Sequence, residues 1–338
     1  MKRIGYTITL TLLIIGLISG CESADKELTI KQPQSPEASQ PTTTSPPSSS
    51  ALDPAKGQET LKQLQVIASQ AKNARELTSF IDANISKVDT HTADSLFAIL
   101  EQFYDQHLPA LNENFAKILT QSHTVEKLNE LEYPFDVNKI KNDDTLKQWL
   151  LNQTEGKLSL DQKEGDYYWR VDYTALNQAY APKLSDEIKS YLSIQAAESK
   201  QNFFRDGSIK VTRDELGDRL LNAEGYLVKY PSGQKKTVVQ ALYLDYLKAY
   251  IYGYRYDAID ENTMKLLPTV KQSYAQLVNK QPDSKTAQIV KEYLVIINEN
   301  KDVIYDPGIK GESIIGSPKT NIARFWNDLD SRVHGLIK

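Results

Sequence analysis

The stretch KLSLDQKEGDYYWRVDY, residues 157–173, decides how the fold is read, because it is the clearest β pattern in a chain of 338 residues. Leu158 and Leu160 alternate with polar residues in its first half, and aromatic or aliphatic residues alternate with polar ones in its second half. The turn-forming run 163–166 separates the halves, so the pattern predicts a β-hairpin. A lone hairpin is marginally stable in water, and we therefore expect its aromatic face to pack on helices.

Helical spacing of apolar residues continues on both sides of this hairpin. Helix-starting residues, such as Asp53-Pro54 and the capping box Thr212 to Glu215, precede several of the periodic segments. The predicted helices cover 54–71, 73–85, 92–119 with an interruption at Pro109, 124–131, 143–150, 185–196, 212–225, 237–253, 268–279, 284–298 and 318–334. The sequence therefore predicts a mainly α fold, a multi-helix bundle or array with one small β-hairpin near 157–173.

Composition distinguishes a polar segment near the N-terminus from the folded region that follows it. Residues 35–50 read SPEASQPTTTSPPSSS, and thirteen of these sixteen are Ser, Thr or Pro, too polar to offset the entropy of ordering. We expect a disordered tether over 21–53, able to span roughly 30 Å as a coil. The remainder is predicted to form an N-terminal helical region, 54–152, and a mainly helical region with the hairpin, 153–338, either separate or as one continuous domain.

The N-terminus has the layout of an export signal. Lys2 and Arg3 form a short positive region, 4–17 is an uncharged apolar run, and Ser19-Gly20 precede Cys21, the only cysteine. Residues 17–21 resemble the lipobox of bacterial lipoprotein precursors. The resemblance covers the first 21 residues and implies that residues 1–20 are a cleaved signal peptide. It also implies that Cys21 carries the lipid and anchors the chain to the outer face of a bacterial membrane. The alternative is an uncleaved anchor helix with an ordinary thiol.

The charge balance and the sequence motifs limit the kinds of ligand and reaction that the sequence predicts. Removal of residues 1–20 leaves 38 basic and 44 acidic residues, a net charge of −6, so there is no electrostatic footprint for nucleic acid. The four histidines show no metal-ligand spacing, and we predict neither a metal site nor a cofactor. Two Ser-x-x-Lys tetrads, at Ser69 and Ser232, lack the Lys-Thr-Gly strand that penicillin-recognising serine enzymes also need.

The hairpin contains the candidate ligand-binding residues. Acidic side chains close to a tryptophan would suit a glycan site that combines two acids with a stacking ring. Glu164 and Asp166 are also ordinary turn residues, which are usually solvated. The predicted binding set is Tyr168, Trp169, Arg170 and Asp172.

Three function classes follow from these features. The favoured one is a lipid-anchored extracytoplasmic surface protein, a non-enzymatic binding module for an envelope protein or wall glycan. The alternatives are a cell-envelope glycan hydrolase and a solute-binding lipoprotein of a transporter. The last class usually has two α/β lobes, which need repeated strand–helix alternation.

A tyrosine-rich segment, 243–256, invites a sugar-binding platform. On a helix, however, Tyr243, Tyr246 and Tyr250 share one stripe with Val239 and Leu247, whereas Asp245 and Lys248 lie opposite. Aliphatic neighbours favour a core face. We therefore predict that the three tyrosines are buried.

Overall fold

The computed structural model describes residues 54–121, 123–205, 207–253, 255–309, 311 and 313–336. The predicted signal peptide, the predicted lipidation site Cys21 and the predicted tether lie outside the described residues. The described residues belong to one compact unit. Within the described ranges, no helix has the length and apolar character needed to cross a membrane.

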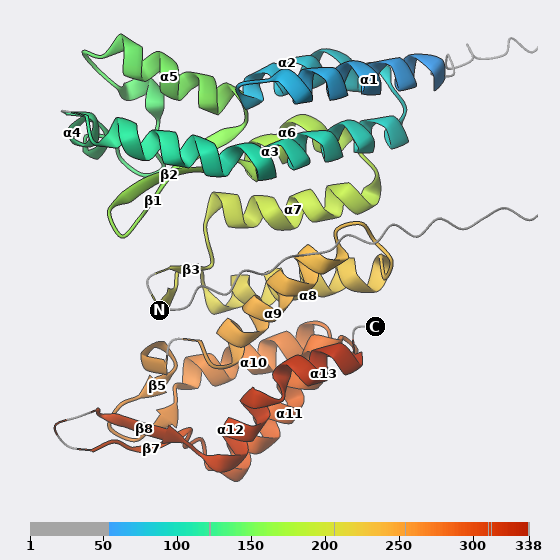
Figure 1. Cartoon of the computed structure of the whole chain (residues 1–338). Coiled ribbons are helices and arrows are strands. Elements are labelled where there is room, and N and C mark those ends of the chain that lie inside the picture. Colours follow the sequence, from blue (N-terminus) through green and yellow to red (C-terminus); the bar gives the residue numbers. More distant parts are fainter. Residues whose placement is uncertain are drawn as a thin grey trace, which may run out of the picture. The chain divides into compact units, whose positions relative to one another are not determined.

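Helices dominate the described residues, so the predicted mainly α fold is confirmed (Figure 1). The α-helices are α1 (Pro54–Gln70), α2 (Ala74–Asn84), α3 (Thr90–Leu119), α4 (Thr124–Asn129), α5 (Asp144–Glu155), α6 (Tyr173–Tyr180), α7 (Asp186–Lys200), α8 (Arg213–Lys229), α9 (Lys236–Ile251), α10 (Pro268–Lys280), α11 (Lys285–Glu299), α12 (Thr320–Asn327) and α13 (Leu329–Leu336). Short 3₁₀ turns cover Ile85–Lys87, Val137–Lys139, Ala181–Lys183 and Arg255–Asp257.

The strands form two-stranded antiparallel sheets. They pair as β1 (Leu158–Lys163) with β2 (Asp166–Val171), β3 (Phe204–Arg205) with β4 (Ser208–Ile209), β5 (Ile259–Asp260) with β6 (Lys265–Leu266), and β7 (Tyr305–Pro307) with β8 (Ile315–Pro318). The first pair is the predicted hairpin. The other three were not predicted, because strands of two to four residues are too short to show alternation.

The hairpin packs on helix α3, and two hydrogen bonds hold it there. Leu160 lies opposite Trp169, and the two turn residues, Glu164 and Gly165, both have positive φ, as a two-residue hairpin turn requires. The Trp169 backbone N–H donates to the Asn112 side chain at 2.7 Å, and that side chain donates back to the Trp169 carbonyl at 2.9 Å. A single asparagine on α3 thus fixes the position of the strand.

The helices pack on neighbours that are close in the chain. Helix α6 contacts α7, α7 contacts α8, and α8 contacts α9, while α10 and α11 pack together and against α8 (Figure 1). One cluster of buried apolar residues runs from Leu64 in α1 to Val333 in α13. The arrangement is an array in which helices bury faces on other helices that lie near them in the chain.

Several predicted boundaries are wrong. Helix α3 continues through Pro109, because Pro109 and Asp105 lie on its exposed face, where water can replace the lost backbone hydrogen bond. Helix α8 continues past Gly225 to Lys229, since the burial of Tyr226 and Leu227 outweighs the weak helix propensity of glycine.

Two further differences concern segments 173–180 and 318–334. The first forms α6, which was not predicted and which begins directly after the hairpin, with the Asp172 side chain as its cap. The second divides into α12 and α13. Ser317 and Pro318 belong to β8, so they do not start a helix, and Lys319 occupies the capping position of α12.

Candidate functional site

The predicted binding residues of the hairpin all have structural contacts. Trp169 is only 1 % exposed and packs against both Phe115 and Trp149, so its ring lies in the core. Asp172 accepts a hydrogen bond from the Ala175 backbone at 3.0 Å. Tyr168 is half-buried, and burial raises the pKa of its hydroxyl. The binding role of these four residues stays a prediction.

Arg170 belongs to a buried ion cluster that the sequence did not reveal. Asp161 on β1, whose side chain is 2 % exposed, pairs with Arg170 at 2.8 Å and with Arg205 on β3 at 2.6 Å. Arg170 also donates to the backbone carbonyls of Glu198 and Ser199. The cluster ties the first hairpin to the end of α7 and to the second hairpin. The predicted acids Glu164 and Asp166 are exposed residues of the hairpin turn and its end.

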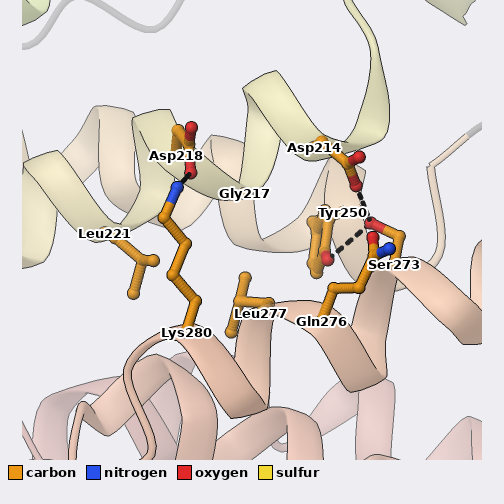
Figure 2. Close-up of a pocket in the computed structure, with 9 residues that line it drawn as sticks. All are labelled: Asp214, Gly217, Asp218, Leu221, Tyr250, Ser273, Gln276, Leu277 and Lys280. Atoms are coloured by element: carbon orange, nitrogen blue, oxygen red, sulfur yellow. Dashed lines mark hydrogen bonds and ion pairs between the residues drawn. The ribbon is translucent and has the colours of Figure 1, made fainter.

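A groove between α8 and α10 brings polar side chains of both helices together and is a candidate site (Figure 2). It consists of two adjoining cavities of about 220 and 450 Å³, which share Asp214, Ser273 and Gln276. We call it the α8–α10 groove. The first cavity is lined by Asp214, Gly217, Asp218, Leu221, Tyr250, Ser273, Gln276, Leu277 and Lys280, and the second adds Thr212, Arg213, Asp257, Thr269, Val270 and Gln272.

A chain of hydrogen bonds fixes the base of this groove. The Ser273 hydroxyl donates to the Asp214 carboxylate at 3.1 Å and lies 2.9 Å from the Tyr250 hydroxyl. Because a serine hydroxyl has a single proton, the Tyr250 hydroxyl must donate to Ser273. Burial raises the pKa of Tyr250, so this donor keeps its proton at neutral pH.

An ion pair crosses the first cavity. Lys280 reaches from α10 to Asp218 on α8 with 2.5 Å between the ammonium and a carboxylate oxygen, and both side chains are about half exposed (Figure 2). Gly217, which has no side chain, lies at the floor of this cavity beside Leu277 and Tyr250. A methyl group there would lie 3.2 Å from a Leu277 methyl carbon and 3.6 Å from the Tyr250 hydroxyl. The glycine therefore contributes to the depth of the groove.

The lining offers carboxylate acceptors, amide groups and an ammonium donor around a small apolar floor. This is the composition of a site that orients a polar ligand through a few placed hydrogen bonds. Among the described residues, no group of three or more His, Cys, Asp or Glu side chains is arranged to hold a metal ion.

Sequence reasoning missed this groove for a physical reason. Asp214 and Asp218 are four residues apart on α8, and Ser273, Gln276 and Lys280 are spaced by three and four on α10. Such spacing places each set on one helix face. A polar face, however, is the usual pattern of a solvated helix, and only the packing of α8 on α10 turns the two faces into one site.

The tyrosine prediction is confirmed. Tyr243, Tyr246 and Tyr250 are each 0 % exposed.

Comparison with known proteins adds no further assignment, because no protein-family model, no curated protein and no solved structure matches this chain. The function must therefore be argued from the sequence and the site.

Proposed function

We propose that the protein is a lipid-anchored extracytoplasmic binding module of a bacterial cell envelope, and that the α8–α10 groove binds a polar component of that envelope, a wall glycan or a protein segment. The lipobox-like residues 17–21 and the Ser/Thr/Pro-rich run 35–50 support the location. The observation that carries the binding role is the groove itself, in which donors and acceptors from two helices surround one cavity.

The contacts of the two α8 acids favour binding over hydrolysis. Glycoside hydrolases generally need two carboxyl groups that act on the substrate, one as an acid and one as a nucleophile or base. Here Asp218 is paired with Lys280, and Asp214 accepts a hydrogen bond from the Ser273 hydroxyl. Both acids already have protein partners, and this arrangement suits recognition better than proton transfer.

The two-lobed solute-binding alternative has less support. Such proteins are built on sheets that alternate with helices. The sheets of the described residues each have two antiparallel strands.

A matched pair of glycine substitutions tests the groove. Gly217→Ala adds a methyl group to the groove floor, whereas Gly225→Ala, on the same helix, adds one where nothing lies within 4 Å. Alanine is favoured over glycine inside a helix by about 1 kcal/mol, which offsets the small shift that Gly217→Ala requires of the Leu277 side chain, so both variants are expected to fold.

The measurement is co-sedimentation of the purified full-length variants with lipid-free cell walls, before and after protease treatment of the walls. We expect the wild type and Gly225→Ala to sediment alike, and Gly217→Ala to lose about threefold or more in affinity. Loss of binding after protease treatment would identify a protein partner, and retention would identify the glycan. Equal binding by the two alanine variants, or no binding by the wild type, would refute the role of the groove.

A further inference from the structure

A second cavity, of about 360 Å³, lies between the β3 segment and the C-terminal half of α9. We call it the aromatic slot. It shares no lining residue with the α8–α10 groove, and its volume is in the lower part of the range for small-molecule sites. Its lining consists of Phe203, Phe204, Asp245, Lys248, Ala249, Tyr252 and Gly253.

The floor of the slot is made by small residues of α9 and of the turn after it. Ala249 follows Asp245 by four residues and precedes Gly253 by four, so the three lie along one side of the helix. A side chain at Gly253 would lie 2.6 Å from the Ala249 carbonyl oxygen, so only glycine fits there. Gly253 lets the chain turn closely against the end of α9, and the small side chain of Ala249 keeps the floor open.

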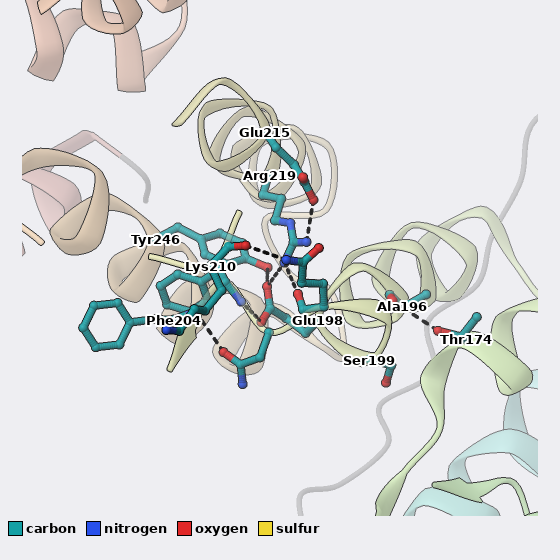
Figure 3. Close-up of polar contacts among 12 residues, drawn as sticks. Thr174, Ala196, Glu198, Ser199, Phe204, Lys210, Glu215, Arg219 and Tyr246 are labelled. Atoms are coloured by element: carbon teal, nitrogen blue, oxygen red, sulfur yellow. Dashed lines mark hydrogen bonds and ion pairs between the residues drawn. The ribbon is translucent and has the colours of Figure 1, made fainter. Parts of the chain in front are cut away.

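The aromatic walls are held in place by the core. Phe203 contacts the Tyr246 ring edge-to-face at 4.9 Å, and its backbone N–H donates to the Glu198 carboxylate at 3.1 Å. Arg219 binds that same carboxylate at 2.5 Å (Figure 3). It also donates to the Gln201 carbonyl at 2.9 Å. The segment that carries both phenylalanines is therefore fixed before any ligand arrives.

The opposite wall is supported in the same way. Tyr252 packs on Trp326 with 5.1 Å between ring centroids, and burial raises the pKa of its hydroxyl. The hydroxyl therefore remains a neutral donor at physiological pH. Phe204 is 36 % exposed, which leaves part of its ring open to a ligand.

The rim carries groups of both hydrogen-bonding kinds. Asp245 is exposed and its charge acts on Lys248, three residues along the helix, so its carboxylate can accept a hydrogen bond at the rim. Lys248 lies 2.8 Å from Asp330 and keeps further donor positions on its ammonium group. Because Asp330 already compensates the charge of Lys248, the ammonium group acts at the rim as a hydrogen-bond donor. A neutral polyol can accept from Lys248 and donate to Asp245.

We propose that the aromatic slot binds one ring of a neutral sugar, with the apolar face of the ring on Phe204 and Tyr252 and its hydroxyl groups on Asp245 and Lys248. The aromatic walls exclude water from one face of the ring, and the charged rim supplies charge-assisted hydrogen bonds, which are stronger than neutral ones. This site does not depend on whether the α8–α10 groove binds a ligand.

The test is saturation-transfer difference NMR on the purified full-length protein with the neutral tetrasaccharides tetra-N-acetylchitotetraose and maltotetraose. Ala249→Leu fills the slot, whereas Ala241→Leu is the matched change at an exposed position of the same helix. We expect sugar-ring signals with the wild type and Ala241→Leu, and about fivefold weaker affinity for Ala249→Leu.

A second variant guards against a folding defect in Ala249→Leu. Asp245→Asn leaves the volume unchanged but removes a charged acceptor, and should weaken binding by about fivefold. The proposal is wrong if neither sugar gives a signal with the wild type, or if both slot variants bind like the wild type. It is also wrong if tetralysine displaces the sugar, because the slot would then recognise a cationic peptide.

Discussion

Helix α9 and the residue that follows it carry tyrosines in two different surroundings. Tyr243, Tyr246 and Tyr250 are completely buried, whereas Tyr252, just after the helix, is half-buried and lines the aromatic slot. The side chain is the same in each case, and only its neighbours differ. The buried face meets other helices, while the open face meets a short hairpin that leaves a cavity. A tyrosine-rich helix therefore does not by itself indicate a binding platform.

Every hydroxyl on the buried face has a partner from another helix. Tyr243 bonds with Thr286 on α11, Tyr246 donates to Glu198 on α7, and Tyr250 donates to Ser273 on α10. Buried polar groups without a partner are costly, so these bonds explain why the stripe contains tyrosine and not phenylalanine. The buried face thus connects α9 to three other helices.

The largest effect is expected on the buried face. Tyr246→Ala should lower the free energy of unfolding by about 4 kcal/mol, because it removes a fully buried ring and a donor to the Glu198 carboxylate. Chemical denaturation measures this change. Tyr246→Phe, which keeps the ring, should cost less than half as much, and a cost below about 1 kcal/mol for the alanine variant would contradict the core assignment.

The loss of stability at alkaline pH should distinguish the buried tyrosines from Tyr252. Burial raises the pKa of Tyr243, so the folded state keeps a proton that the unfolded chain loses near pH 10. Stability from this group is complete below pH 10 and falls above it by up to about 1.4 kcal/mol per pH unit. Tyr243→Phe should reduce the steepness of this loss, measured by denaturant titration at several pH values. Tyr252→Phe is the control and should reduce it less; equal effects would erase the distinction between the faces.

The smallest effect on stability is expected on the open face. Phe204→Ala should change the free energy of unfolding by about 1 kcal/mol or less, because the side chain is partly exposed and borders a cavity. The same denaturation experiment measures it. A loss comparable to that of Tyr246→Ala would show that Phe204 supports the core and is not primarily a wall of the slot.

Local patterns predicted most of the helices and the first hairpin. The caps Ser185, Thr212 and Ser284 start their helices as expected, because each satisfies a backbone N–H within one turn. Pro109 and Gly225 misled the prediction, since their local cost is small beside tertiary packing. The three short strand pairs depend on contacts that no local pattern encodes.

The candidate sites were much less predictable. In the sequence, Trp169 is an aromatic residue close to acids, which is the pattern of a glycan site. Its burial results from contacts with Phe115 and Trp149, which the sequence does not show. Phe203 and Ala249 lie more than forty residues apart, and Gly217 and Ser273 more than fifty. Each pair meets in a cavity because helices distant in sequence pack together, and a single sequence does not reveal such pairs.

The central claim is that this helical array is held at the outer face of a membrane by lipid on Cys21. Metabolic labelling with a fatty acid tests it directly, by comparing the wild type with Cys21→Ser. We predict a labelled wild type and an unlabelled variant that accumulates as precursor or in the soluble fraction. Label on the Cys21→Ser protein, or none on the wild type, would contradict the claim.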